Sequence, residues 1–425
     1  MNPPQPEGGT ARWLDRLGIP APLAWGYLGL LVFMIGNGIE SGYLSPYLAS
    51  RGVPEGDVAW IFTVYGLTAA AAAWFSGALS DLWGPHRVMW IGLVVWMVFH
   101  AAFMVWGIAP ADYRMLLVTY ALRGFGYPLF AFGFLVWITA ATPPARLSTA
   151  AGWFWFAFTG GMPTLGSLVA SYTAPWIGPV ATLWCALALV AAGGAIALFG
   201  VREPRGRKRL APAGERVIAT LLSGVSIGWR NPKVGAGCIV RTINTASQFG
   251  FFVFLPAYFT ATVGFSLSQW LRLLSFMFLS NIVWNLLFGI IGDRFGWRRT
   301  VALFGGMGCA VSTLLLYYVP AATGGSYAAA VLAAMLYGAT LAAYVPLSVL
   351  MPSLAPEHKG AAMSMLNLGA GASVWVGPAI VGLLLDRVGV GGVMWTFAIL
   401  YVISAGLTLT LTLPEESRRG GPAPD

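Results

Sequence analysis

The chain has 425 residues, of which 58% are hydrophobic and only 9% are charged, and its formal net charge is +9. An ordinary soluble domain carries roughly 25% charged residues, so this chain has too little charge to cover a water-facing surface. The composition excludes a soluble globular fold. The net positive charge does not indicate a nucleic-acid partner, because the basic residues lie in short loops between apolar runs.

Apolar runs of about 20 residues recur along the chain, and a helix of that length crosses a hydrocarbon core about 30 Å thick. Lipid offers the backbone no hydrogen bonds, so each run is predicted to be a helix. The stretch before Leu23 is polar and Pro-rich and has no signal-peptide pattern, so the first helix is expected to remain in the mature protein. The twelve predicted spans are 23–49, 58–79, 88–109, 115–140, 148–171, 181–200, 234–260, 271–291, 300–320, 327–351, 361–385 and 393–413.

The loops on the two sides of these spans differ in their content of Lys and Arg. Four such residues lie on one side, in loops that begin after odd-numbered spans: Arg51, Arg114, Arg272 and Arg387. Eighteen lie on the other side, in the tails and the remaining loops: Arg12, Arg16, Arg87, Arg146, Arg202, Arg205, Arg207, Lys208, Arg209, Arg216, Arg230, Lys233, Arg294, Arg298, Arg299, Lys359, Arg418 and Arg419. The positive-inside rule therefore predicts that both termini lie in the cytoplasm.

The sequence contains an internal repeat. GALSDLWGPHR from Gly77 resembles GIIGDRFGWRR from Gly289, at an offset of 212 residues, half the chain. The same offset aligns LSTAAG from Leu147 with KGAAMS from Lys359. We predict an all-α membrane protein of two pseudo-symmetric six-helix bundles. The predicted parts are a cytoplasmic tail (1–22), a first bundle (23–200), a cytoplasmic linker (201–233), a second bundle (234–413) and a second cytoplasmic tail (414–425).

The residue types of the repeated loop suit a latch that holds adjacent helix ends together in one conformation. Its glycines let helices and a tight turn approach closely, while Asp and Arg can bridge adjacent helix ends at the cytoplasmic face; a purely structural role is the alternative. The loop resembles the signature of the major facilitator superfamily, although Leu82 stands where a basic residue often follows the Asp. The predicted gating residues are Gly77, Asp81, Gly84, Arg87, Gly289, Asp293, Gly296, Arg298 and Arg299.

Longer stretches resemble the bacterial polyol permeases, which are proton-coupled carriers of ribitol and D-arabinitol. These stretches are FTVYGLTAAAAAW from Phe62, RGFGYPLF from Arg123, GWFW from Gly152, RTINTASQFGF from Arg241 and HKGAAMSMLNLGAG from His358. The resemblance implies secondary active transport with alternating access, a pentitol such as ribitol or D-arabinitol as the cargo, and proton symport as the driving force. It implies no cofactor other than the proton gradient, a monomer as the transport unit, and a location in a bacterial cytoplasmic (inner) membrane.

The first bundle offers the candidates for proton coupling. Glu40 is the only acidic residue in a predicted span, and a carboxylate at that depth costs roughly 2.5–3.5 kcal/mol unless it is protonated or paired. Arg123 is its natural partner, because a buried guanidinium stays charged and needs an acceptor. A hydrated Glu40 at a cavity mouth and an Arg123 bound to backbone carbonyls are the alternatives. Asn37, three residues before Glu40, stands where the family pattern often has Asp.

Carriers built from repeats bind their cargo near the midplane between the halves, so polar and aromatic residues deep in spans are candidate substrate contacts. Amides suit hydroxyl groups because they both donate and accept, and rings suit C–H faces. Helix-to-helix hydrogen bonding of the amides and packing of the rings are the alternatives. His100 is expected to be a satisfied core residue. The candidates are Asn37, Glu40, Tyr65, Tyr127, Trp153, Trp155, Arg241, Asn244, Gln248, Asn281, Asn285, Asn367 and Trp375.

Other function classes find less support. A membrane enzyme or an ATP-driven pump lacks a metal-ligand cluster and a G-x-x-x-x-G-K-[ST] loop, and a sensor would need an attached soluble domain. Within carriers, a proton-coupled exporter of drugs or metabolites and an uncoupled polyol facilitator are the alternatives. The predicted partners are a small polar solute and membrane lipid, with no metal and no nucleic acid.

Overall fold

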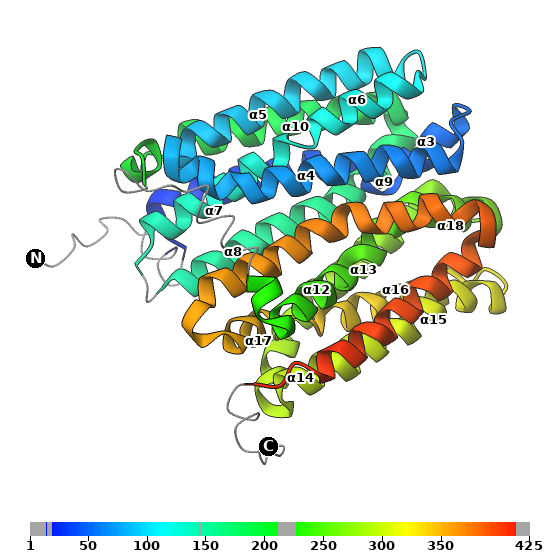
Figure 1. The fold of residues 1–425 in the computed structure, drawn as a ribbon. Helices are drawn as coiled ribbons and strands as arrows, with labels where there is room; N and C mark the ends of the chain where they lie inside the picture. The colour runs from blue at the N-terminus through cyan, green and yellow to red at the C-terminus, as the bar shows by residue number, and fades with distance from the viewer. Residues whose placement is uncertain (1–13, 15–18, 144–145, 211–226, 414–425) are drawn as a thin grey trace, which may run out of the picture.

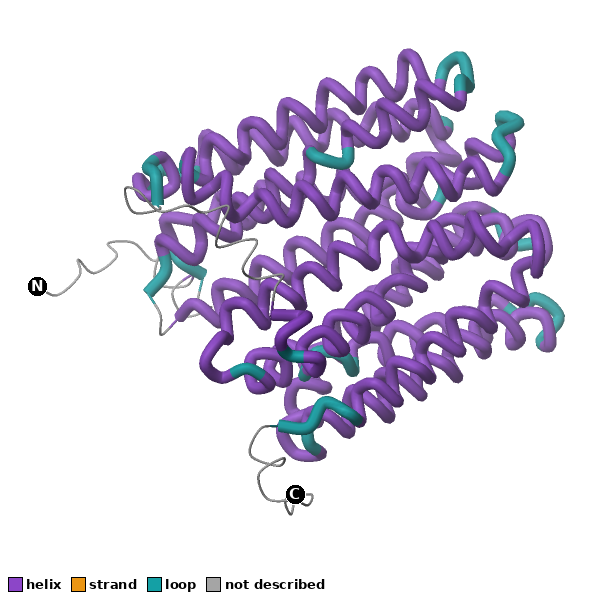
Figure 2. The backbone as a smooth tube through the Cα atoms, viewed as in Figure 1, coloured by secondary structure: helices purple, strands orange, loops and turns teal. Residues whose placement is uncertain are grey.

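A computed structural model describes residues 14, 19–143, 146–210 and 227–413, and these residues form helices joined by short loops. Figure 2 colours the described helices purple, and no strand occurs within those ranges. Most of the first predicted tail, all of the second predicted tail (414–425) and the middle of the predicted linker (211–226) lie outside the described residues. The helices of the first half are η1 Ala21–Leu23, α2 Ala24–Gly38, η2 Ile39–Gly42, α3 Leu44–Ser50, α4 Glu55–Trp83, α5 Pro85–Ala102, η3 Phe103–Ile108, α6 Tyr113–Arg123, α7 Gly126–Ala141, α8 Leu147–Thr159, η5 Gly160–Leu165, α9 Gly166–Ile177, α10 Pro179–Gly200 and η6 Pro204–Arg207.

The second half repeats the pattern of long helices interrupted by short irregular turns. Its helices are α12 Pro232–Ala257, η7 Tyr258–Thr262, α13 Leu267–Phe295, α14 Trp297–Thr300, η8 Val301–Met307, α15 Gly308–Ala322, α16 Tyr327–Ala342, α17 Leu347–Leu354, η9 Pro356–His358 and α18 Lys359–Leu409.

The described residues supply ten helical segments long and apolar enough to cross a membrane. One of them, Ala361–Leu409, contains two helices that meet at Gly389, whose φ of 65° and ψ of −178° are not helical. The run from Leu147 to Ile177 is a further helix, through α8, η5 and α9. The predicted all-α membrane fold is confirmed.

The long helices lie side by side in two groups, which Figure 1 shows with α4, α5, α6 and α10 in the upper part and α13, α15, α16 and the end of α18 in the lower part. The end of the molecule that carries η6, α14 and α17 is called the linker end here, and the opposite end, which carries α3, the far end. α12 follows the linker and runs to the far end, where α13 begins.

The two repeated loops have matching backbone geometry. Gly84 has φ 87° and ψ 138°, and Gly296 has φ 88° and ψ 132°. Residues other than glycine rarely adopt this backbone conformation. Their surroundings differ, because the backbone oxygens of Gly206 and Lys208 lie close to Gly84 whereas no atom lies within 4 Å of the position of a Cβ on Gly296. The start of the linker thus packs over the first loop.

Three predicted spans contain a break that positions the site. The span predicted over 23–49 is not one continuous helix, because α2 ends at Gly38 and the 3₁₀ turn η2 carries Glu40. α6 ends at Arg123, and the π-helical turn η5 contains Pro163. Irregular backbone at membrane depth is tolerated where it is buried in protein or lines a cavity. Asn37 and Glu40, three residues apart in the sequence, therefore belong to different helical elements, α2 and η2.

Close packing between α13 and α16 gives a first prediction. A Cβ on Gly338 would lie 1.9 Å from the backbone oxygen of Met277, so Gly338→Ala must push the two helices apart. We expect this variant to lower the free energy of unfolding by about 1–3 kcal/mol, as overpacked cores do. Gly406→Ala is the matched control, because no atom lies within 4 Å of its Cβ position. Thermal unfolding in detergent tests this, and equal midpoints for the two variants would contradict it.

Candidate functional site

The site is built around a buried ion pair between the turn η2 and the end of α6. Arg123 donates to both carboxylate oxygens of Glu40, with Nη1 at 2.8 Å from Oε2 and Nη2 bonded to Oε1. The hydroxyl of Tyr120 donates to the same Oε1 at 2.9 Å. Arg123 is fully buried and Glu40 is 5% exposed. The predicted contact is confirmed, and Arg123 is not held by backbone carbonyls as the alternative had it.

His100 of α5 takes part in this pair. Its Nδ1 lies 2.8 Å from Arg123 Nη1, and its Nε2 lies 3.0 Å from the backbone oxygen of Leu183. Because a carbonyl only accepts, the proton of the ring sits on Nε2, and Nδ1 accepts from the guanidinium. His100 is a satisfied core residue, as expected, but it also contacts the site, which the sequence did not indicate.

Aromatic rings enclose the guanidinium of Arg123. Its Cζ lies 4.5 Å from the ring centroid of Tyr120, 5.0 Å from Trp96, 5.5 Å from Tyr65 and 5.6 Å from Phe103. A cation at this distance from a ring face is attracted by about 2 kcal/mol or more when the contact is desolvated. The rings and Glu40 together make it possible to keep a charged arginine at membrane depth.

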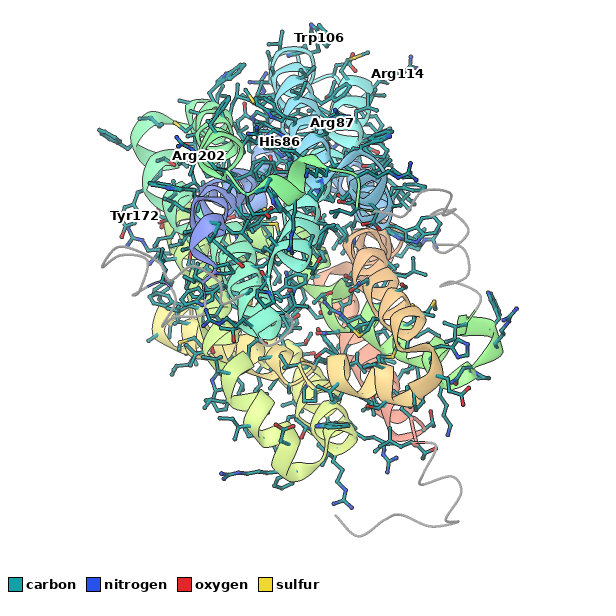
Figure 3. The ribbon with its side chains drawn as sticks, turned by 90° about the vertical axis from the view of Figure 1, so that its left-hand side faces the viewer. His86, Arg87, Trp106, Arg114, Tyr172 and Arg202 are labelled. Carbon is teal, nitrogen blue, oxygen red and sulfur yellow. The ribbon has the colours of Figure 1, made fainter. Side chains whose placement is uncertain are left out.

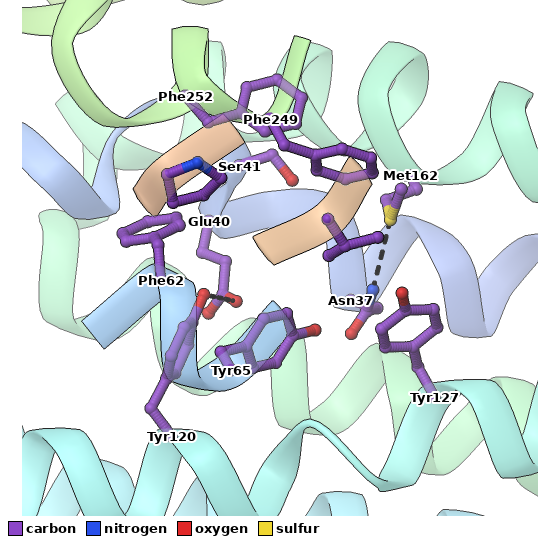
Figure 4. Close-up of a pocket in the computed structure, with 12 residues that line it drawn as sticks. Asn37, Glu40, Ser41, Phe62, Tyr65, Tyr120, Tyr127, Met162, Phe249 and Phe252 are labelled. Carbon is purple, nitrogen blue, oxygen red and sulfur yellow. Dashed lines mark hydrogen bonds between the residues drawn. The ribbon is translucent and has the colours of Figure 1, made fainter. Parts of the chain in front are cut away.

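Asn37 lies beside the ion pair. Its Oδ1 accepts from Trp96 Nε1 at 2.8 Å, and its Nδ2 lies 3.5 Å from the sulfur of Met162. The donor from Trp96 fixes the orientation of the amide, so that Nδ2 points to the cavity side where Met162 lies, as Figure 4 shows.

A pocket between the two halves contains these residues. Figure 4 shows Glu40, Tyr65 and Tyr120 on one side of it and Phe249 and Phe252 on the other. The volume of the pocket is about 40 Å³. One water needs roughly 10–15 Å³ measured in this way, so there is room for only a few waters. The lining residues are Asn37, Glu40, Ser41, Phe62, Tyr65, Tyr120, Tyr127, Met162, Phe249, Phe252, Val374 and Pro378.

Hydrogen bonds between the halves close the pocket on the side of the far end. Trp270 Nε1 donates to the backbone oxygen of Gly42 at 2.7 Å, and Ser268 donates to that of Ser171 at 2.8 Å. Ser45 donates to the backbone oxygen of Val253. Each of these bonds joins a side chain of one half to the backbone of the other, so the halves cannot separate there without breaking them.

The structure brings four of the predicted substrate contacts to the pocket: Asn37, Glu40, Tyr65 and Tyr127. The aromatic candidates of the helix 147–177 lie outside the pocket lining. Trp153 is half-buried and stacks edge-on with Phe156, and Trp155 is 44% exposed and packs against Phe158. Trp375 is half-buried where α18 packs against Gly66 of α4. The ring contacts of Trp153 and Trp155 fit the packing alternative, and a substrate role for the three tryptophans stays a prediction.

The polar candidates of the second half are spread over three helices. Asn281 donates to the backbone oxygen of Gly338 at 3.0 Å and so joins α13 to α16, which is the helix-to-helix alternative. Asn285 donates to Asn281 at 3.2 Å within α13 itself. The remaining four do not line the pocket: Arg241 is half-buried, Asn244 and Gln248 are buried, and Asn367 is exposed.

Several lining residues were not predicted from the sequence. Tyr120 lies three residues before Arg123 on the same face of α6, a spacing that could have indicated it. Phe62, Phe249 and Phe252 are apolar and gave no signal among the many aromatic residues of the chain. Ser41 and Met162 are brought to the pocket by the turns η2 and η5, which no periodicity indicates.

The repeated loops lie at the linker end, and Figure 3 looks onto that end, with His86 and Arg87 labelled. Asp293 accepts from Trp297 Nε1 at 3.0 Å, and a pocket of about 220 Å³ lies beside it. In the first loop, the backbone oxygen of Asp81 accepts from the backbone N–H of Leu210 at 3.0 Å. The gating role of both loops stays a prediction.

Comparisons with known proteins agree with this architecture. The family described as the Major Facilitator Superfamily matches residues 26–284 and 237–425. The alpha-ketoglutarate permease of Bacillus subtilis (strain 168) is 47% identical over 406 residues, 95% of this chain and 92% of that protein. The D-arabinitol transporter of Klebsiella pneumoniae is 40% identical over 91% of this chain and 92% of that protein, and its ribitol transporter is 38% identical over 91% of both.

Two solved structures share the fold at low sequence identity. The crystal structure of a D-xylose-proton symporter covers 92% of this chain and 97% of that one, with a TM-score of 0.70 at 15% identity. The crystal structure of the peptide transporter POT in complex with sulfate covers 94% of this chain and 95% of that one, with a TM-score of 0.74 at 17% identity. At these identities the likeness concerns the fold alone.

Proposed function

The chain belongs to the major facilitator superfamily, and on that premise we propose that it imports a small, linear, oxygen-rich solute by symport with protons. It is a multi-pass membrane transporter and not an enzyme, as its relatives are all transporters. The symport, the direction and the solute are the parts that we propose. We further propose that one chain is the transport unit and that no cofactor is needed besides the proton gradient.

The observation that carries this proposal is the buried pair of Glu40 and Arg123 beside the pocket. A proton that binds Glu40 cancels the charge that holds Arg123, and the guanidinium then has donors to offer to a solute in the pocket. His100 and the surrounding rings retain the arginine during this exchange. A proton and a solute would thus be bound together, which is what symport requires.

The small volume of the pocket requires a movement of the halves. A pocket with room for a few waters does not hold a linear solute of several carbons, so the solute enters when the halves separate. The hydrogen bonds on the side of the far end oppose separation there in this conformation. We propose that exchange of the solute takes place from the linker end in this state and from the far end after those bonds break.

Two classes of solute fit this description. Linear polyols are favoured by the amide of Asn37 and the hydroxyls of Tyr65 and Tyr127, which can pair with hydroxyl groups, and by the names of the two Klebsiella relatives. This is the class that the sequence predicted. A linear dicarboxylate is favoured by the relative at 47% identity and by Arg241, a cation at membrane depth without an acidic partner among the described residues.

The excess of Lys and Arg on one side of the spans supports a further proposal on orientation. We propose that the linker end faces the cytoplasm, with both termini there, in the cytoplasmic membrane of a bacterium. Labelling of single cysteines introduced at Arg114 and at Arg202 with a membrane-impermeant reagent in whole cells tests it. Labelling at position 114 alone is expected, and labelling at position 202 alone would contradict the orientation.

Uptake into proteoliposomes tests the function. We expect that an imposed inward proton gradient stimulates the uptake of labelled ribitol, D-arabinitol or alpha-ketoglutarate several-fold over uptake without a gradient. Uptake that ignores the gradient would point to the uncoupled facilitator. Uptake driven only by an outward gradient would point to the exporter. Either result would contradict symport.

A further inference from the structure

Arg241, like Arg123, lies far from both ends of its membrane-spanning segment, but its environment differs from that of Arg123. It lies ten residues into the segment Pro232–Thr262, hence about 14 Å along the helix from its start. Its side chain makes one hydrogen bond, from Nη1 to the hydroxyl of Thr245 at 3.5 Å. In the described part of the chain, no carboxylate forms an ion pair with it.

The guanidinium of Arg241 is expected to face the interior of the protein and not lipid. The residue is half-buried, so part of its surface is accessible. A charged side chain at this depth almost always faces the bundle interior or a water-filled cavity, because contact with lipid is too costly. Successive residues of a helix are rotated by about 100°, so Arg241, Gln248 and Phe252 lie within about 40° of one another on α12. Phe252 lines the pocket, and this face of α12 therefore leads from the pocket toward the linker end.

Two amides for which the described part of the chain supplies no hydrogen-bond partner accompany Arg241 on this path. Gln248 is 8% exposed, and its amide makes no hydrogen bond within the described residues. Asn367 is exposed, and on α18 it shares a face with Val374 and Pro378, which line the pocket. The two helices touch at this level, because a Cβ on Gly369 would lie 3.0 Å from Cβ of Arg241.

We infer that Arg241 binds a carboxylate group of the carried solute and that the solute is therefore a linear carboxylate and not a neutral polyol, an inference that rests on the proposed function. Glu40 and Arg123 neutralise each other, so Arg241 leaves one uncompensated positive charge on the path. A neutral solute would leave this charge without a counterpart. A carboxylate supplies one in the bidentate geometry that a guanidinium favours, and the amides of Gln248 and Asn367 donate to its remaining oxygens.

The test compares two five-carbon solutes, the dicarboxylate glutarate and the neutral pentitol ribitol. Gradient-driven uptake of each is measured as a function of concentration in proteoliposomes of the parent chain, Arg241→Gln and Arg241→Lys. Arg114→Gln is the matched control, because Arg114 is exposed in the first turn of α6, at the far end. Binding of both solutes to the purified variants is measured by calorimetry, which needs no transport.

We expect the parent to take up and bind glutarate in preference to ribitol. Arg241→Gln is expected to raise the half-saturating and dissociation constants for glutarate by about tenfold or more, since a charged hydrogen-bonding partner is lost. Arg241→Lys should recover part of this loss and Arg114→Gln should behave as the parent. Gradient-driven uptake of ribitol alone, or equal affinity for glutarate in the parent and Arg241→Gln, would overturn the inference and leave symport standing. Absence of glutarate binding would also overturn the inference. Binding of glutarate through Arg241, with uptake that does not respond to the proton gradient, would contradict only the proposed symport.

Discussion

Replacing Glu40 by glutamine is expected to abolish the accumulation of solute against its gradient while the exchange of solute across the membrane continues. Glutamine keeps the size of the side chain and can still accept from Tyr120, but it cannot take up or release a proton. Without a group that carries the proton, the gradient no longer drives the solute. Uptake with an inward proton gradient, compared with counterflow from solute-loaded proteoliposomes, measures the two properties separately.

The control for this prediction is Glu357→Gln, which removes a carboxylate from the exposed turn η9. It should accumulate the solute as the parent does. Undiminished accumulation by Glu40→Gln would contradict the coupling role of Glu40. Loss of counterflow together with accumulation would indicate that Glu40 is needed for binding and not specifically for coupling.

The second large effect concerns stability and is expected for Arg123→Leu. This change leaves Glu40 buried without its cation, and breaking a buried pair in this way typically costs about 3–5 kcal/mol. The double variant Glu40→Gln with Arg123→Leu removes both charges and is expected to regain much of that loss, since no uncompensated charge remains. The midpoint of thermal unfolding in detergent, measured for the two single variants and the double variant, tests this.

The unfolding midpoint of the double variant, compared with that of Arg123→Leu, decides this prediction. If the double variant is as unstable as Arg123→Leu, the loss comes from the aromatic packing around the guanidinium and not from the unpaired carboxylate. If Arg123→Leu and the double variant are both as stable as the parent, the ion pair contributes nothing to the stability of the fold. A double variant that regains stability but still lacks accumulation would separate the structural role of the pair from its transport role.

The pairing of Glu40 with Arg123 could be predicted from the sequence because few partners exist for charges in lipid. An isolated charge in a span is costly, so one acid and one arginine in neighbouring helices of the first bundle were expected to meet. Arg241, by contrast, forms no ion pair with a carboxylate among the described residues. Where an electrostatic cost restricts the options, the sequence is informative.

Neutral polar residues are not restricted in this way, and there the sequence was less informative. His100 and Trp96 can bond to any nearby carbonyl or amide, so nothing in the sequence connected them to the arginine. Asn281 and Asn285 form a spacing that suits a solute site, but Asn281 bonds across to α16 and Asn285 bonds to Asn281 within α13 instead. The lengths of the apolar runs predicted the spans, whereas the turn η2 within the first of them depends on tertiary packing.

The most direct test of the symport is the movement of protons when the solute is added. Proteoliposomes in a lightly buffered medium, without any imposed gradient, receive the solute that the uptake assay has identified, and the external pH is recorded. Symport through Glu40 predicts a rise of the external pH with the parent chain and no change with Glu40→Gln. Entry of the solute with the parent chain at constant external pH, or with a fall in external pH, would contradict it.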